Sequence, residues 1–134
     1  MPHEKTFLIV DDDTDDLHFF CEVVNDIDPS IKCFTAFDGV DALRQLGSVM
    51  KKLPDYIFLD LNMPRMDGRE FLAEIKKDKK LKNVPVIIFS TSALQRDMED
   101  TKKLGAVHYL IKPTDLQKLK QQIILVMKTV DAAQ

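Results

Sequence analysis

The feature that most constrains the fold is a regular alternation between short apolar runs and longer segments in which apolar residues recur every three or four positions. The runs, which are typical of strands, lie at residues 7–10, 31–37, 56–59, 86–89 and 107–111. Four of them are nearly continuous, as in strands covered on both faces, whereas the run at 31–37 is more mixed and is expected nearer an edge. Five strands that each lead into a helix predict an α/β fold, with one parallel sheet and helices on both faces.

The helical segments carry start and stop signals. Three pairs of residues match a capping box, in which two polar side chains three positions apart bond free backbone groups of the first turn: Asp67 with Glu70, Ser92 with Gln95, and Thr114 with Gln117. Gly105 fits the end of the helix that begins near Ala93. The last helix has the clearest apolar face, formed by Leu116, Leu119, Ile123, Val126, Met127 and Val130.

The composition is that of an ordinary globular domain. The chain has 134 residues, 45% hydrophobic and 31% charged, so we expect a single domain over residues 1–134, with a core at about 6–130 and no output domain. The net charge of −3 gives no electrostatic reason to expect a nucleic acid as partner. The lysine cluster at residues 76–82 is expected to be the solvated end of a helix and its loop.

Cysteine usage and hydropathy favour a cytoplasmic protein. Cys21 and Cys33 lack further metal ligands at zinc spacing, so they are expected to be buried thiols in a reducing compartment. No charged-then-apolar leader precedes Phe7, and no apolar run approaches the length that spans a membrane. We therefore expect a cytoplasmic location and no contact with a membrane.

Polar side chains with complementary chemistry follow the strands. The carboxyl ends of parallel strands open onto one edge of the sheet, where open α/β sheets bind ligands. The residues that the strands deliver there are Asp11, Asp12 and Asp13 from the first strand, Asp60 from the third, Ser90 and Thr91 from the fourth, and Lys112 from the fifth. Neighbouring carboxylates would repel by about 4 kcal/mol at a separation of about 4 Å and an effective dielectric near 20. Such a site favours a hard cation, Mg²⁺, Mn²⁺ or Ca²⁺, over zinc, and a short set of carboxylates completed by waters suits Mg²⁺.

The same set of groups suits a phosphoryl group, with Asp60 as the nucleophile, Lys112 as a mobile positive charge and Ser90 as a hydroxyl donor. Each residue also has a simpler explanation. The aspartates at 11–13 would fit a solvated turn that caps the first helix, and Asp60 or Lys112 would fit an ordinary strand end. The hydroxyl of Ser90 would fit a bond to local backbone. Their joint placement on one edge favours the phosphoryl site.

The set of motifs resembles the receiver domain of response regulators over essentially the whole chain. The matching segments are Val10-Asp11-Asp12, Leu59 to Pro64 followed by Asp67-Gly68, Ser90 five residues after Pro85, and Lys112-Pro113. The resemblance implies a flavodoxin-like, doubly wound sheet with its five parallel strands in the order 2-1-3-4-5. This order is taken from the family and not from the residues themselves.

The resemblance implies a phosphoryl acceptor and a metal site. Asp60 would accept a phosphoryl group from a sensor histidine kinase or a histidine phosphotransfer protein. Mg²⁺, with Mn²⁺ as a substitute, would be held by Asp11, Asp12, Asp60 and the backbone carbonyl of Asn62. Lys112 would pair with Asp60 and then with a phosphoryl oxygen. The protein would not be an enzyme beyond its self-catalysed phosphoryl transfer and autodephosphorylation.

The resemblance also implies moving parts. Ser90 would swing toward the phosphoryl group and Tyr109 would change rotamer in step. Asn62 and Ser92 would tune the lifetime of the phosphoryl group, although Ser92 also fits a plain helix cap. The Lys112–Pro113 bond would be cis, which the low general frequency of cis bonds before proline would not by itself justify.

Without an output domain the protein would act through another molecule. It could relay the phosphoryl group, drain a kinase, or present a surface that depends on phosphorylation. The expected surface is the fourth helix, fifth strand and fifth helix around Tyr109, facing an unidentified downstream protein or a second copy in a homodimer.

Three other classes of protein fit less well. Phosphatases of the haloacid dehalogenase type begin with Asp-x-Asp-x-Thr/Val after a strand, but here Thr14 stands fourth and Asp15 fifth, and Asp60 is left unexplained. A flavodoxin-type flavin carrier needs a phosphate loop rich in hydroxyls and amides, and three aspartates would repel its phosphate. A pseudo-receiver that only binds partners would lack the site residues.

Overall fold

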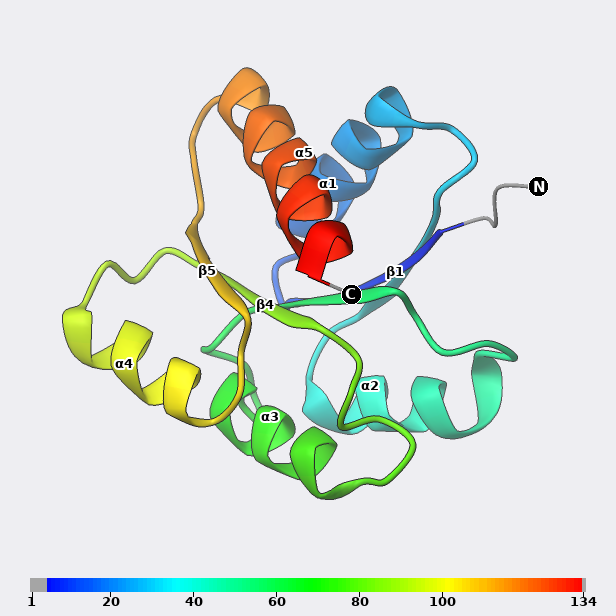
Figure 1. Ribbon diagram of the computed structural model, residues 1–134, viewed down its shortest axis with the longest axis vertical. Helices are drawn as coiled ribbons and strands as arrows, with labels where there is room; N and C mark the ends of the chain where they lie inside the picture. The colour runs from blue at the N-terminus through cyan, green and yellow to red at the C-terminus, as the bar shows by residue number, and fades with distance from the viewer. Residues whose placement is uncertain (1–4, 134) are drawn as a thin grey trace.

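The computed structural model describes residues 5–133 and contains one parallel sheet. Its strands, within those residues, lie in the order β2-β1-β3-β4-β5, as expected (Figure 1). Their bounds are Thr6–Val10 for β1, Lys32–Ala36 for β2, Tyr56–Leu59 for β3, Val86–Ser90 for β4 and His108–Ile111 for β5. The alternation in the sequence therefore gives the expected doubly wound α/β fold.

The helices cover both faces of the sheet. Helices α1 and α5 lie on one side, and α2, α3 and α4 lie on the other (Figure 1). The bounds are Thr14–Ile27 for α1, Gly39–Arg44 for α2, Gly68–Lys77 for α3, Gln95–Lys103 for α4 and Leu116–Ala133 for α5. Helix α2 continues as a short π-helix, Gln45–Val49, in which the backbone N–H of Met50 reaches the carbonyl of Gln45.

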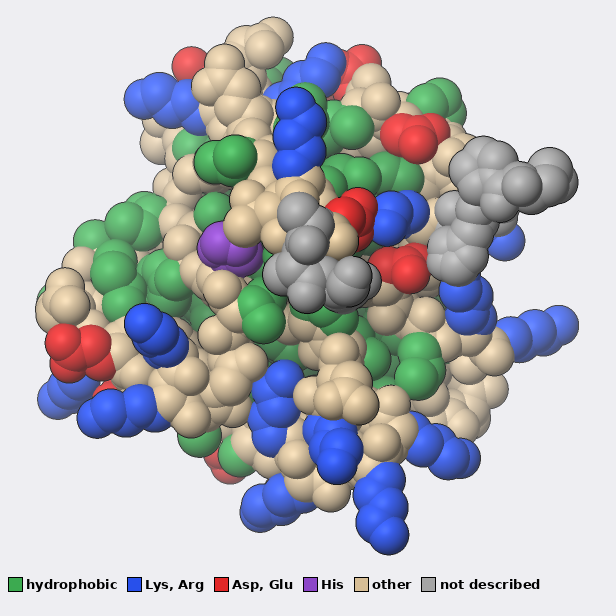
Figure 2. All heavy atoms as spheres, in the orientation of Figure 1, with side chains coloured by type: hydrophobic (Ala, Val, Ile, Leu, Met, Phe, Trp, Pro, Cys, Tyr) green, Lys and Arg blue, Asp and Glu red, His purple; other side chains and the backbone are tan. Residues whose placement is uncertain are grey.

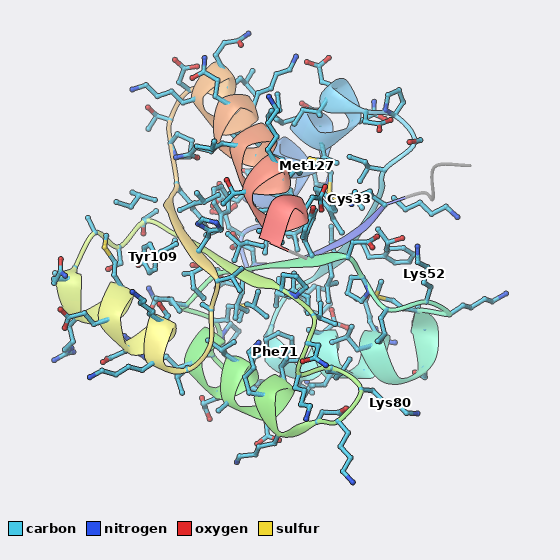
Figure 3. All side chains as sticks on the ribbon, in the orientation of Figure 1. Cys33, Lys52, Phe71, Lys80, Tyr109 and Met127 are labelled. Carbon is cyan, nitrogen blue, oxygen red and sulfur yellow. The ribbon has the colours of Figure 1, made fainter. Side chains whose placement is uncertain are left out.

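The sheet separates two apolar clusters. One is built around Phe20 of α1, Phe58 of β3 and Ile123 of α5, and the other around Ile57 of β3 and Phe71 of α3, which is labelled in Figure 3. Every residue of β1, β3 and β4 is buried, because these strands have a neighbour on each side and helices above and below. Because these three strands are closely packed, they hold the residues at their ends in fixed positions.

The two outer strands are less covered. The mixed run at 31–37 becomes β2, and its position at an edge confirms that expectation. The expectation that 107–111 would be covered on both faces is wrong, since β5 is the other edge strand and its residues are half-buried or exposed. An apolar run marks a strand, but only the strand order decides whether that strand has one neighbour or two.

The capping predictions have mixed outcomes. Asp67 and Glu70 form the predicted capping box at the start of α3, and Gly105 follows the end of α4 with a φ of 105°. The other two boxes are wrong. Helix α4 has Leu94 at its N-cap with no side-chain bond, while the first turn of α5 is bonded by Asp115 and not by Thr114. Helix α1 is capped by Asp13, whose carboxylate accepts bonds from the N–H groups of the two acids that follow Thr14.

The lysine cluster forms the end of α3 and the turn that follows it, as expected. Lys77 ends the helix, and Lys79, Lys80 and Lys82 are exposed. Figure 2 shows lysine and arginine side chains projecting from this side of the molecule, and Figure 3 labels Lys80 among them. Within residues 5–133, no helix is both long enough and apolar enough to cross a membrane.

Candidate functional site

The carboxylates predicted to meet are side by side because of the strand register. Val10 of β1 pairs with Leu59 of β3, so Asp11 and Asp60 follow at the same level of the sheet. The ladder continues past both strands, because the N–H of Asp60 donates to the carbonyl of Val10 at 2.9 Å. Carboxylate oxygens of Asp11, Asp12 and Asp60 lie within 4.8 Å of one another. The structure thus brings these three predicted residues together.

Local backbone bonds fix how the carboxylates point. The N–H of Asp13 donates to Asp11 at 3.0 Å, and the N–H of Leu61 donates to Asp60 at 2.9 Å. Asp11 is 1% exposed and Asp60 8% exposed, whereas Asp12 is open to solvent. The cluster therefore combines two buried carboxylates with one that is exposed.

Gly68 is required for this arrangement. A Cβ atom at this position would lie 2.3 Å from the backbone oxygen of Asp60 and 2.7 Å from the Cα of Leu61. The N–H of Gly68 also donates to the carbonyl of Leu61 at 2.9 Å. The start of α3 thus presses directly against the backbone of Asp60, and only glycine allows so close an approach.

The electrostatics of the carboxylates favour a cation. Burial and the negative charge of Asp11 raise the pKa of Asp60 to about 6, against an opposing effect of Lys112. Burial also raises the pKa of Asp11, although bonds from Lys112 and from the backbone of Asp13 oppose it. Oxygen ligands of high charge suit hard divalent cations. The cluster therefore fits a divalent metal ion.

Lys112 reaches the same site from the fifth strand. Its N–H donates to the carbonyl of Ser90 at 2.8 Å, which extends the ladder between β4 and β5. Its ammonium lies 2.7 Å from a carboxylate oxygen of Asp11, 2.8 Å from Asp16 and 3.7 Å from Asp60. Burial alone would lower the pKa of Lys112, but the bonds to Asp11 and Asp16 outweigh burial and raise it. The predicted pairing with Asp60 exists, but two other carboxylates lie closer.

Asp16 is one of the site residues that sequence reasoning missed. It lies in the first turn of α1, where acidic residues are common because of the helix dipole, so its presence there had an ordinary explanation. A signal existed in the spacing, since the first turn of a helix that follows a strand lies above the same sheet edge as the strand end.

The predicted switch residues form a chain of hydrogen bonds along the loop after β4. The N–H of Ser92 donates to the hydroxyl of Ser90 at 3.2 Å, and Ser90 is fully buried. The hydroxyl of Tyr109, a half-buried residue labelled in Figure 3, donates to the carbonyl of Ser92 at 2.9 Å. The ring on β5 and the serine at the end of β4 are therefore both tied to one short loop.

The same loop is tied to α4 and α3. The hydroxyl of Ser92 donates to Asp97, and Arg69 of α3 pairs with the same carboxylate. These bonds from Ser92 and Arg69 lower the pKa of Asp97. Ser92 therefore does not cap α4 from its N-cap position but bonds a side chain in the first turn. Sequence reasoning missed Arg69 and Asp97, and their distance in sequence gave no signal.

Two further predictions concern the loops around the carboxylates. Asn62 is exposed in the loop after β3, on the way to Arg65. Arg65 has a φ of 59° and donates two bonds to Asp38, so the loops after β3 and β2 are clamped together.

The predicted cis bond at Lys112–Pro113 is wrong: the peptide bonds of residues 5–133 are all trans, the form that X–Pro bonds favour when nothing else intervenes.

Comparison with known proteins agrees with this geometry. A family model of the response regulator receiver domain matches residues 7–124. The response regulator Rcp1 of Synechocystis sp. is 34% identical over 123 residues, a match that covers 89% of this chain and 84% of that protein. Five other relatives are longer, and the match covers 55% of their length or less.

Solved structures share both fold and sequence. The phosphorylated cyanobacterial phytochrome response regulator RcpA is similar with a TM-score of 0.81 and 35% identity, over 90% of this chain and 89% of that one. The Mn²⁺-bound form of the response regulator Rcp1 has a TM-score of 0.78 and 32% identity, over 89% of this chain and 88% of that one.

Proposed function

The chain belongs to the response regulator receiver family, and from this membership we propose that Asp60 accepts a phosphoryl group in a Mg²⁺-dependent transfer from a histidine kinase or a histidine phosphotransfer protein. The observation that carries the proposal is the grouping of Asp60 with Asp11 and Asp12, with the ammonium of Lys112 beside them. One similar structure is of a phosphorylated response regulator and another of a Mn²⁺-bound one, which supports the proposal.

The transfer exchanges one bond to phosphorus for another. A carboxylate oxygen of Asp60 forms a bond to phosphorus while the bond from phosphorus to the donor's imidazole nitrogen breaks, and the imidazole keeps the electron pair. Phosphoryl transfer is mostly positioning and stabilisation of charge, so a cation and an ammonium around the acceptor suffice. Buried strand ends hold Asp60 in place, because its backbone is bonded to β1 and pressed against α3.

Positive charge is supplied from two directions. Asp11, Asp12, Asp60 and the backbone carbonyl of Asn62 would hold Mg²⁺, or Mn²⁺ in its place, and this ion would neutralise oxygens of the phosphoryl group. Lys112 contributes a second positive charge, since its ammonium lies 3.7 Å from Asp60. The same ion is needed when water reverses the transfer, so we propose self-catalysed transfer and autodephosphorylation, and no other enzymatic activity.

The phosphoryl group would be read out through the loop after β4. The hydroxyl of Ser90 would leave its bond with the Ser92 backbone and donate to a phosphoryl oxygen, and the loop and Tyr109 would follow. Asn62 and Ser92 would flank the group and influence its lifetime. The surface formed by α4, β5 and α5 would then bind an unidentified downstream protein or a second copy of this chain.

The first test is the intact mass after incubation with acetyl phosphate, with Mg²⁺ or with a chelator. We expect a gain of one phosphoryl group that requires Mg²⁺ and is absent in Asp60→Asn. Asp67→Asn is the matched control, because asparagine caps a helix as well as aspartate does and should leave the gain intact. A folded wild-type protein that gains no mass under any condition would overturn the proposal.

The readout surface is tested separately. Sedimentation and amide exchange are compared before and after phosphorylation of the same sample. We expect a changed sedimentation coefficient or changed protection in α4, β5 and α5. Identical values in both states would show that phosphorylation does not alter this surface.

A further inference from the structure

The two cysteines lie together, away from the carboxylate site. Cys21 is on α1 and Cys33 is on the edge strand β2, and their Sγ atoms are 2.7 Å apart. Both are free thiols in this structure. We infer that Cys21 and Cys33 form a redox-active pair that closes to a reversible disulfide between α1 and β2.

The geometry needs little change for the bond to form. The sulfur–sulfur bond length is about 2.05 Å, so the two sulfurs have about 0.7 Å to move. The side chains already point toward each other from two elements that pack together, and both contact the apolar cluster beneath α1 and α5. Figure 3 labels Cys33, whose side chain lies on the α1 side of the sheet.

The burial of the two thiols differs from the prediction. The sequence predicts buried thiols, but both residues are only half-buried. Cys21 lines an open hollow of about 620 Å³, together with Leu17 and His18 of the same helix and Phe37 beyond β2. A small oxidant can therefore approach Cys21 without unfolding of the core.

A shared metal ion is a poor alternative explanation. Within residues 5–133, the only group of three or more histidine, cysteine or acidic side chains placed to hold a metal is the carboxylate cluster of Asp11, Asp12 and Asp60. Structural zinc sites use four ligands, and here two sulfurs meet without others at ligand distance. The pair is therefore better suited to forming a disulfide bond than to binding a metal ion.

The two thiols are not equivalent. The hydrogen bond with Cys33 lowers the pKa of Cys21, whereas that bond and burial raise the pKa of Cys33. Thiolates and not thiols attack disulfides. Cys21, which also lines the hollow, is thus the attacking residue and Cys33 the resolving one.

The reaction is an exchange with a low-molecular-weight disulfide such as oxidised glutathione. The Cys21 thiolate attacks one sulfur of glutathione disulfide, forms a mixed disulfide and releases one glutathione thiolate. Cys33 then loses its proton and attacks the Cys21 sulfur, which releases the second glutathione thiolate. Two protein thiols are oxidised, one glutathione disulfide is reduced, and the two protons go to the two leaving thiolates.

The bond would cross-link an edge strand to a helix through a short loop. Cys21 and Cys33 are 12 positions apart, and the segment between them contains the turn from α1 to β2. Closing this loop restricts the unfolded chain, so the oxidised protein should have a melting temperature about 5–10 °C higher than the reduced protein. The stability of the α1–β2 contact would then depend on the thiol redox state.

The test is incubation of the folded protein with oxidised glutathione, followed by thiol alkylation and intact mass. We expect the wild type to lose two hydrogens, to lose both alkylation sites and to regain them with dithiothreitol. Cys33→Ser should stop at one glutathione adduct, because the resolving thiol is gone. Cys21→Ser should react much more slowly, since the remaining thiol of Cys33 does not line the hollow and its pKa is raised by burial.

Two outcomes would overturn the proposal. One is a wild-type protein that keeps two alkylatable thiols in a buffer that oxidises a reference dithiol peptide. The other is oxidation that yields only glutathione adducts or covalent dimers. The wild-type result stands without the variants, so a variant that fails to fold does not affect the test.

Discussion

Two regions of the same sheet edge are built in different ways. At the centre, β1 and β3 are fully buried, and their ends hold carboxylates in an arrangement that is electrostatically unfavourable without a cation. At the side, β5 is half-exposed, and the loop after β4 is held by single hydrogen bonds from Tyr109 and Ser92. In the centre, the carboxylates are fixed in position and their negative charge needs a cation. In the side region, the charged side chains are already paired and the loop after β4 can change its conformation.

Under the proposed function, this difference would place the phosphoryl acceptor and the surface that responds to it in different kinds of structure. Chemistry benefits from a rigid acceptor, since misplacement of the reacting groups costs rate. Readout benefits from an element with two arrangements of similar energy. Substitutions that act on one region should therefore leave the other unaffected, and the following experiments examine that separation.

The largest effect is expected from Gly68→Ala, which acts on the centre. The added Cβ would collide with the backbone oxygen of Asp60 at 2.3 Å, so we expect a loss of about 3 kcal/mol or more in the free energy of unfolding. Urea denaturation measures it. Gly47→Ala is the control, because nothing lies within 4 Å of its Cβ position and the change should cost little. Equal losses in the two variants would refute the close approach as the cause.

A smaller effect with a defined sign is expected from Asp60→Asn in the absence of divalent cations. The pKa of Asp60 is about 6 in the folded state, against 3.8 for an unperturbed aspartate, so the folded state binds the proton more tightly than the unfolded chain does. The free energy of unfolding of the wild type should therefore fall as the pH rises from about 4 to about 6.

Asp60→Asn should reduce this fall to the part that comes from the raised pKa of Asp11, and should be more stable than the wild type at pH 7, by at most about 3 kcal/mol. Urea denaturation across this pH range, in the presence of a chelator, measures both. Added Mg²⁺ should stabilise the wild type more than the variant. If the free energy of unfolding of the wild type instead rises over the same pH range, the folded state does not raise the pKa of Asp60.

Tyr109→Phe acts on the side region and should cost about 1 kcal/mol, the usual worth of one hydrogen bond. Amide exchange should speed up in the loop after β4 and stay unchanged in β1 and β3. Tyr56→Phe is the matched control, because its hydroxyl bonds Asp131 at the other end of the molecule. Faster exchange in the central strands of Tyr109→Phe would mean that the two regions are not separate.

The smallest change in stability, below about 1 kcal/mol, is expected from Asp16→Asn, because Asp16 is partly exposed. This substitution removes one of the two closest partners of Lys112 and frees its ammonium to approach Asp60. If Asp60 is the acceptor, the phosphoryl gain from acetyl phosphate should become a few-fold faster. Asp15→Asn lies in the same helical turn and serves as the control. Equal rates in both variants would show that Asp16 does not restrain Lys112.

The sequence predicted the centre better than the side. The apolar run before Asp60 and the capping box of Asp67 and Glu70 are local signals, and both are borne out because buried strands and first helical turns depend on neighbouring residues. The strand order came from the family resemblance and is confirmed. The roles of the site residues remain predictions.

What the sequence could not predict depends on contacts between distant elements. Asp16 meets Lys112 across 96 positions, and Arg69 meets Asp97 across 28. The place of Asp16 in the first turn of α1 indicates the sheet edge on which it lies, but no local pattern identifies its partner or the partner of Arg69. The predicted cap at Ser92 was wrong for a local reason, because its hydroxyl donates to Asp97, five positions further along in the first turn of α4. The cis bond expected at Lys112–Pro113 rested on analogy alone.

The bond between Lys112 and Asp11 has a consequence for how the protein folds. It joins residues 101 positions apart, which directly follow β1 and β5, the first and the last strand in the sequence. Contacts this distant form late, because the entropy of closing the intervening chain must be overcome before they stabilise anything. A chain that has folded only its first three strands would hold the carboxylates without their ammonium. A complete site therefore forms only after β5 has joined the sheet that holds β1 and β3, and under the proposed function a partly folded molecule would be a poor phosphoryl acceptor.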